Sequence, residues 1–237
     1  MTLASAVVPL AAYAIAFQTV LYLSLPTRLR TLVAPVVTGV IGAALTIGAG
    51  ILFGFETIGL GPIGMVPAMA WGLATVLLVS AIGTFMMSRP DLRTQLADPR
   101  LAELSPAKAV LQIFVRIPVF TALIEEAFFR GVLHAALMAI LPIESAIWIG
   151  AGLFGIWHVG PGLDQARANN KSKQAGALHT LVTVAVTTIA GAFLIWLRVE
   201  TGSIWASVAV HAGMNMTLAV FARLAGRTSP VPVAVTV

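Results

Sequence analysis

The stretch "IGMVPAMAWGLATVLLVSAIGTFMM", residues 63–87, runs for 25 residues without a charged side chain. About 20 mostly apolar residues in a helix cross the hydrocarbon core of a bilayer, and a helix pairs its backbone polar groups within itself. This stretch therefore predicts a transmembrane helix.

Similar apolar runs recur along the whole chain, which is 59% hydrophobic and 10% charged and has a mean hydropathy of +0.97. The pattern predicts an all-α fold: a polytopic transmembrane helical bundle with about seven spans. The first run has no basic segment before it and is longer than the core of a signal peptide, so we expect it to be retained as a helix. The fifth run is short enough to be tilted or partly re-entrant. The runs cover about 4–25, 31–54, 63–87, 117–141, 143–158, 178–197 and 203–222.

The overall composition also excludes several classes of site. The chain has no cysteine, which rules out disulfides, thiolate metal sites and a cysteine nucleophile. Its pI is about 10.5, but in a membrane protein an excess of basic residues is typical of cytoplasmic loops. We therefore expect a lipid bilayer around the chain and no nucleic-acid partner.

Charged residues sort the loops into two sides. One set of alternate loops, with the C-terminal end, is basic, whereas the opposite set holds Glu56, Glu144, Glu200 and one base, Arg198. By the positive-inside rule, this distribution predicts an inner (plasma) membrane protein with its N-terminus outside and its C-terminus in the cytoplasm. The basic set is Arg28, Arg30, Arg89, Arg93, Arg100, Lys108, Arg167, Lys171, Lys173, Arg223 and Arg227.

The longest polar interruption lies at residues 88–116. It predicts a short amphipathic helix near 90–106 on the inner membrane surface. It also separates N-terminal transmembrane helices and a cytoplasmic linker, 1–104, from a helical core, 105–223, and a C-terminal tail, 224–237.

Ionisable residues interrupt the fourth apolar run at "LIEEAFFRG", residues 123–131. A charge in the middle of a membrane costs at least about 2.5–3.5 kcal/mol on insertion scales, so each one needs a reason. Glu126 and Arg130 are four residues apart on one helix face and predict a structural ion pair, and His134 continues the same stripe. Glu125 is rotated by about 100° from Glu126 and is left to face a cavity.

Polar residues on two later runs complete a possible pocket. His158 ends the fifth run, and His211 and Asn215 lie four residues apart on the seventh. With Pro118 in the first turn of the fourth span, Glu125 would lie about two turns from the cytoplasmic side. We therefore expect these four polar side chains to meet in the inner half of the bilayer. His134 and His179, taken singly, are typical of helix packing or of the membrane interface.

Three short motifs carry a resemblance to a known family. The segments "EEAFFR" (residues 125–130), "FGIWH" (154–158) and "HAGMN" (211–215) resemble the EExxxR, FxxxH and HxxxN motifs of the CPBP intramembrane proteases. This group, also called the Abi family, includes the type II CAAX prenyl endopeptidases. The resemblance covers about residues 105–223 and makes this segment the expected catalytic core.

The resemblance implies an intramembrane endopeptidase that cleaves a membrane-embedded peptide or protein. It implies that Glu125 activates the hydrolytic water with help from His158, while His211 and Asn215 stabilise the oxyanion. Glu126, Arg130 and Phe154 would be supporting residues. Peptide hydrolysis needs a base and donors aimed at developing negative charge, and these side chains supply both. Because the cluster holds no Ser, Cys or Lys, we do not expect a covalent acyl-enzyme.

The metal requirement stays open at this point. Glu125, His158 and His211 could hold Zn²⁺ with one open position, but the chain has no HExxH motif. Direct activation of water by a glutamate accounts for the same residues, so we favour a mechanism without a cofactor.

Two other functions use similar residues. The first is a non-catalytic membrane scaffold or bacteriocin-immunity protein of the same family. The second is a transporter or proton relay, although the outer halves of the spans offer few polar side chains beyond threonines. The sequence identifies no membrane-protein partner. The excess of arginine over lysine is typical of a GC-rich bacterial genome, in which prenylated CAAX proteins are not expected.

Overall fold

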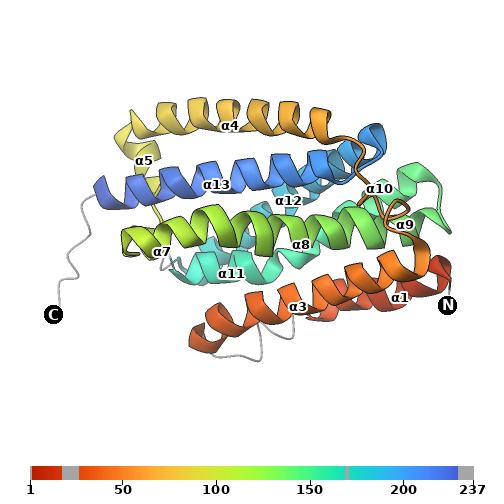
Figure 1. The fold of residues 1–237 in the computed structure, drawn as a ribbon. Coiled ribbons are helices and arrows are strands. Elements are labelled where there is room, and N and C mark those ends of the chain that lie inside the picture. The colour runs from red at the N-terminus through yellow and green to blue at the C-terminus, as the bar shows by residue number, and fades with distance from the viewer. Residues whose placement is uncertain (1, 18–26, 169–170, 229–237) are drawn as a thin grey trace. The chain divides into compact units, whose positions relative to one another are not determined.

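The computed structural model describes residues 2–17, 27–168 and 171–228, and the regular secondary structure among them is helical (Figure 1). Within these described residues, six helices are long and apolar enough to cross a membrane. A shorter apolar helix covers Leu3–Ile15, and the second half of the predicted first span, 4–25, lies largely outside the described residues. The prediction of a polytopic helical membrane protein is confirmed. The six helices are Val36–Phe53, Met65–Met87, Pro106–Met138, Ile143–Arg167, Lys173–Thr201 and Trp205–Thr228.

The chain divides into two compact units, each made of two separate stretches. The first unit comprises Met1–Pro67 and Ile124–Ser207, and the second comprises Ala68–Leu123 and Val208–Val237. The two units are defined by contacts within the fold and combine distant stretches. The predicted division into the consecutive segments 1–104, 105–223 and 224–237 was based on sequence pattern, and it stays a prediction.

In the first unit, two long helices lie side by side over much of their length. α10 packs along α12, and α11 packs along the same helix. Gly155 of α10 makes the approach possible, since a Cβ atom there would lie 2.0 Å from Oγ1 of Thr188 on α12. The elements of this unit are α1 (Leu3–Ala12), η1 (Tyr13–Phe17), α3 (Thr27–Phe53), α8 (Ile124–Glu126), η3 (Ala127–Leu133), α9 (His134–Met138), α10 (Ile143–Trp157), α11 (Val159–Ala168) and α12 (Lys173–Thr201).

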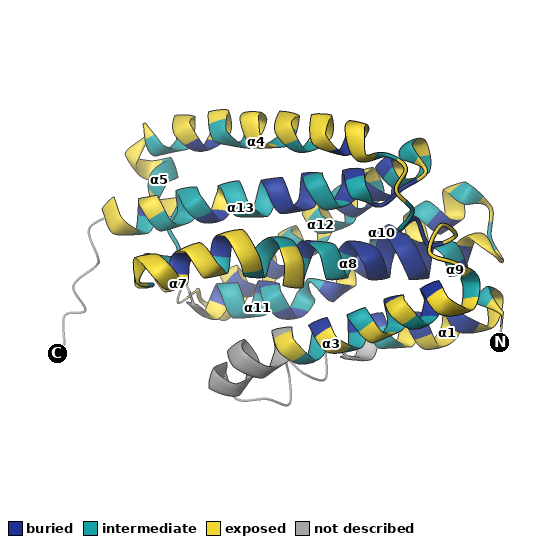
Figure 2. Cartoon of the chain, viewed as in Figure 1, coloured by how far each residue is buried: buried dark blue, intermediate teal, exposed yellow. Residues whose placement is uncertain are grey.

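The core of the first unit is aromatic. Every residue of η3 is buried, which gives the dark-blue stretch that begins at α8 in Figure 2. Phe129 of η3 makes edge-on contacts with Phe154 and Trp157 of α10, at centroid distances of 5.1 and 5.4 Å. Such pairs contribute about 0.5–1.5 kcal/mol each beyond the area that they bury. The fourth and fifth spans are therefore fixed together where both carry polar motif residues.

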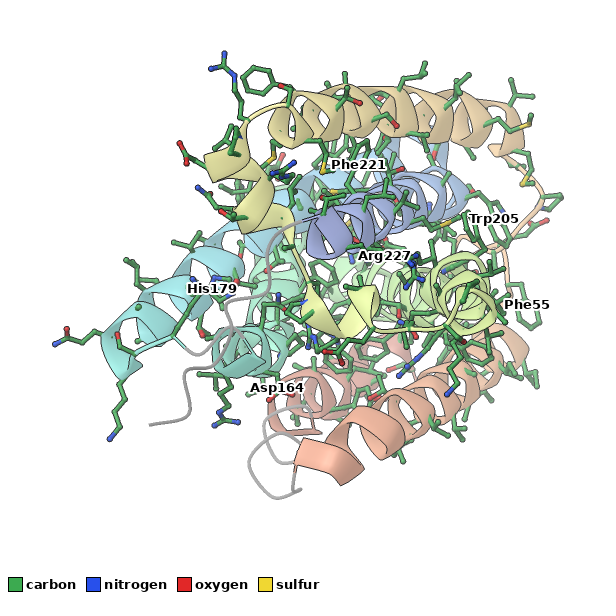
Figure 3. The ribbon with its side chains drawn as sticks, turned by 90° about the vertical axis from the view of Figure 1, so that its left-hand side faces the viewer. Phe55, Asp164, His179, Trp205, Phe221 and Arg227 are labelled. Atoms are coloured by element: carbon green, nitrogen blue, oxygen red, sulfur yellow. The ribbon has the colours of Figure 1, made fainter. Side chains whose placement is uncertain are left out.

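In the second unit, α4 and α13 approach closely through small residues. A Cβ atom at Gly72 of α4 would lie 3.0 Å from Ala209, and one at Gly83 would lie 2.5 Å from the ring of Phe221, which Figure 3 labels on α13. Such small residues are typical of helix pairs in membranes. This unit contains α4 from Ala68 onwards (Met65–Met87), α5 (Pro90–Leu96), α6 (Pro99–Ala102), α7 (Pro106–Leu111), η2 (Gln112–Leu123) and α13 from Val208 onwards (Trp205–Thr228).

The polar interruption folds as two short helices, α5 and α6, in place of one helix near 90–106. Each begins with a proline in its first turn. The carboxylate of Asp98, between the two helices, accepts a hydrogen bond from the backbone N–H of Arg100 and so caps α6. Arg223 of α13 donates to the carbonyl oxygens of Leu101 and Leu104. This arginine thus satisfies carbonyl groups that the short helix leaves without partners.

The expected start of the fourth span is wrong. Pro118 does not begin the helix: Ser105 caps it, Pro106 occupies its first turn, and it continues to Met138. Pro118 lies within η2, a π-helical stretch, and wider winding is one way in which a helix accommodates an internal proline. Glu125 lies 19 residues after Pro106, so it is near the middle of this helix rather than two turns from its start.

The fifth apolar run, predicted at 143–158, coincides with α10, which covers Ile143–Trp157 and ends at His158. The more polar helix α11 follows directly and continues the helical region to Ala168. Pro161 lies in the first turn of α11. The N–H groups of a first turn have no partner within the helix, so the N–H that proline lacks is not needed there. His158 is therefore the joint between two helices, with φ −87° and ψ 2°.

Candidate functional site

Glu126 and Arg130 form a fully buried ion pair. Nε of Arg130 lies 3.1 Å from Oε2 of Glu126, and both side chains are 0% exposed. Nη2 of Arg130 also donates to the carbonyl oxygen of Gly191 at 3.4 Å, and the guanidinium lies over the ring of Phe154, 4.0 Å from its centroid. A buried charge needs this kind of compensation, so the pair has the geometry that the four-residue spacing predicts.

The helix that carries these residues is wound irregularly. The π-helical stretches η2 and η3 flank the three residues of α8, and Glu125 and Glu126 end that short segment. Stretches of π-helix inside longer helices are rare and occur frequently at functional sites. The two glutamates thus lie at a place where the regular succession of helix faces is broken.

Glu125 has different surroundings from its neighbour. Its side chain is half-buried, and Oε1 accepts a hydrogen bond from Nε1 of Trp157 at 3.3 Å. Oε2 is buried and has no hydrogen-bond partner among the described residues. One carboxylate oxygen is therefore held by the protein and the other is not.

The carboxylate of Glu125 lines a small cavity in the first unit. The cavity volume is about 10 Å³, which is about the space that one water molecule needs. Its walls are mainly apolar and aromatic, so Glu125 is the single ionisable carboxylate among its lining residues. The lining residues are Tyr13, Thr38, Gly42, Ile124, Glu125, Phe128, Phe129 and Trp157.

His158 is oriented by the backbone of its own helix. Nδ1 lies 2.8 Å from the carbonyl oxygen of Phe154, and because a carbonyl can only accept, this nitrogen carries the proton of the bond. In the neutral imidazole, Nε2 then has the lone pair that can accept a proton. The ring also packs edge-on against the ring of Phe154, at 4.6 Å between centroids. His158 directly follows Trp157, which contacts Glu125.

His211 and Asn215 belong to α13 in the second unit. The exposed fraction of His211 is 4%, and Asn215 is half-buried. Their spacing on an uninterrupted α-helix puts both side chains on one face. The first unit holds Glu125 and His158, so a meeting of all four residues stays a prediction.

The remaining single histidines differ in burial. His134 is 5% exposed, and its Nδ1 has no hydrogen-bond partner among the described residues. His179 of α12, labelled in Figure 3, is half-buried.

Sequence reasoning did not single out Trp157 or Tyr13. Trp157 is the fourth residue of "FGIWH", and an indole N–H in an apolar span is itself a sign of a buried hydrogen bond. Tyr13 lies more than 100 residues earlier in the chain, and only the folded structure brings it to the cavity of Glu125.

The donor set does not show a complete metal site. No group of three His, Asp or Glu side chains within residues 2–17, 27–168 and 171–228 is arranged to hold a metal ion. Zinc held by Glu125, His158 and His211 stays a prediction.

The family comparison matches the segment that contains all the motif residues. Residues 107–217 match the model of the family described as type II CAAX prenyl endopeptidase Rce1-like. The match supports the assignment of this segment to the CPBP/CAAX protease family. Glu125, His158, His211 and Asn215 lie within the matched residues, whereas Tyr13 lies outside them. No curated protein and no solved structure matches the chain.

Proposed function

We propose that this protein is an intramembrane endopeptidase in which Glu125 activates the attacking water. The observation that carries the proposal is the state of its carboxylate: one oxygen is held by Trp157, the other is buried without a partner among the described residues, and Glu125 lines a cavity. A base needs an oxygen that is free to take a proton within reach of the reacting group. The family of the segment supports the same reaction.

The proposed reaction is a direct hydrolysis. Glu125 removes a proton from water while the water oxygen forms a bond to the carbonyl carbon of the scissile peptide. His211 and Asn215 donate hydrogen bonds to the oxyanion that develops, and such donors typically contribute a factor of about 10²–10³ each. When the tetrahedral intermediate collapses, the C–N bond breaks and the leaving amine receives the proton from Glu125. His158 assists by accepting a hydrogen bond from the water at Nε2.

The supporting residues hold the catalytic side chains in position. Arg130 is bound to Glu126 and lies on Phe154, and the backbone of Phe154 orients His158. The buried ion pair and the histidine are thereby joined through one phenylalanine.

We further propose that the substrate is a membrane-associated peptide or protein and that the site lies in the inner half of the plasma membrane, with the C-terminus in the cytoplasm. The apolar cavity wall favours a peptide that enters from lipid or from the membrane surface. Prenylated substrates are suggested only by the description of the matched family.

The experiment compares the membrane proteomes of cells that produce the wild type, Glu125→Gln or no protein, and then tests the purified proteins on a peptide library. We expect peptides or shortened proteins that depend on the wild type and are missing with Glu125→Gln. If no protein changes in length or abundance and no peptide is cleaved, the scaffold function replaces the protease. Cleavage that persists in a strong chelator would exclude a zinc requirement.

A further inference from the structure

Trp157 makes a hydrogen bond whose direction is fixed by chemistry. An indole N–H can only donate, and an ionised carboxylate can only accept. The 3.3 Å contact therefore runs from Nε1 of Trp157 to Oε1 of Glu125. It joins the fifth span to the carboxylate on the fourth.

The indole ring is held in place by its neighbours. Trp157 is 2% exposed, and its ring contacts Tyr13, Phe128 and Phe129 at centroid distances of 5.9, 6.4 and 5.4 Å. These three side chains also line the cavity of Glu125. Because the ring is enclosed on several sides, its N–H is a fixed donor.

We propose that Trp157 is a positioning residue that holds the carboxylate of Glu125 for catalysis. This inference rests on the proposed role of Glu125 as the base. With Oε1 bound to the indole, Oε2 is the oxygen that faces the reaction, and the carboxylate cannot rotate freely between the two. A base that is held in one orientation is aligned with the water more of the time, and this raises the rate of proton transfer.

The test replaces only the donor. Trp157→Phe keeps an aromatic ring in the core and removes the N–H, so we expect kcat to fall about tenfold, which is the usual effect of losing a hydrogen bond to a charged group. KM should stay within a factor of two, because Trp157 acts on the base and not on the substrate. The matched control is Trp148→Phe on the same helix, where the side chain is 62% exposed; it should leave both constants unchanged.

A spectroscopic measurement separates this inference from the proposed function. The ultraviolet resonance Raman band that reports indole hydrogen bonding, taken as wild type minus Trp157→Phe, should show a strong bond in the wild type and a weaker one in Glu125→Gln. If the wild type cleaves peptides, Glu125→Gln does not, and Trp157→Phe retains full kcat, the positioning role is wrong while the protease stands. If the wild type cleaves nothing, the protease proposal fails, and the positioning role fails with it even where the Raman band shows the bond. When Trp157→Phe is too unstable to study, the spectra of the wild type and Glu125→Gln are compared directly, and an indole hydrogen-bonding band that is the same in both overturns the contact itself.

Discussion

Glu125 and Glu126 are neighbours in the chain, but their carboxylates have opposite surroundings. Glu126 is fully buried against the charge of Arg130, whereas Glu125 is half-buried, with one oxygen bound to Trp157. The spacing of four residues was enough to predict the ion pair, because neighbours on one helix face follow from helix geometry. The bond from Trp157 could not be predicted in this way, since it depends on how two helices pack.

This asymmetry predicts different results for the same substitution at two adjacent positions. Glu125→Gln should reduce kcat by about 10²–10⁴, the contribution of a general base, and leave thermal unfolding in detergent nearly unchanged. Glu126→Gln leaves the guanidinium of Arg130 buried without a countercharge and should cost about 3–5 kcal/mol of stability. Peptide cleavage and thermal unfolding of both variants check the prediction. Equal, purely catalytic losses would show that the two carboxylates share one role.

The central part of each long helix could be predicted from the sequence, but the ends of the helices could not. A long run of uncharged residues identifies a membrane-spanning helix, because only an apolar segment is stable in the hydrocarbon core. Pro118 misleads, because a proline need not mark the first turn of a helix when π-winding accommodates it in the interior.

The packing of α10 against α12 should depend on one glycine. In Gly155→Ala, the new Cβ atom would lie 2.0 Å from Oγ1 of Thr188 and 2.9 Å from the carbonyl oxygen of Val184. We expect a loss of about 1–3 kcal/mol from overpacking and a lower kcat, because His158 lies three residues further along. Gly152→Ala on the same helix has no atom within 4 Å of the new Cβ and should keep its stability. Thermal unfolding and peptide cleavage of both variants measure the difference, and equal stability of the two would disprove the close-packing argument.

The short helix α6 should respond to acid through its cap. Burial raises the pKa of Asp98, but the hydrogen bonds and the charge of Arg100 outweigh burial and hold this pKa below its usual value of 3.8. A lowered pKa means that the ionised cap stabilises the fold above pH 3.8 and that this stabilisation is lost as the pH falls through the lower, folded-state pKa. Hydrogen exchange over residues 90–104, corrected for its intrinsic pH dependence, should therefore accelerate only below about pH 4. Asp98→Asn, which caps without a charge, should remove this acid response; an unchanged response would assign it to another group.

At the scale of the whole molecule, the distribution of charged residues predicts how the protein is oriented in the membrane. Glu56 follows the apolar helix Val36–Phe53, and the basic residues Arg89 and Arg93 follow Met65–Met87. By the positive-inside rule, alternation of this kind predicts that the basic loops are cytoplasmic. If each of the six long helices among the described residues crosses the membrane, Thr228 must lie on the side where α3 starts, because six crossings are an even number. The side of the N-terminus then depends on whether the segment 4–25 crosses.

The absence of cysteine allows this orientation to be tested with single substitutions. Thr2, Glu56, Ser88 and Thr228 are exposed, and each can be replaced by cysteine and treated with a membrane-impermeant maleimide in intact spheroplasts. We expect labelling of Thr2→Cys and Glu56→Cys from outside, and of Ser88→Cys and Thr228→Cys only after permeabilisation. If Thr2→Cys joins the second group while Glu56→Cys stays in the first, the N-terminal segment does not cross and the protein has six spans. If all four positions exchange sides, the positive-inside assignment is wrong, and the orientation proposed for the active site is wrong with it.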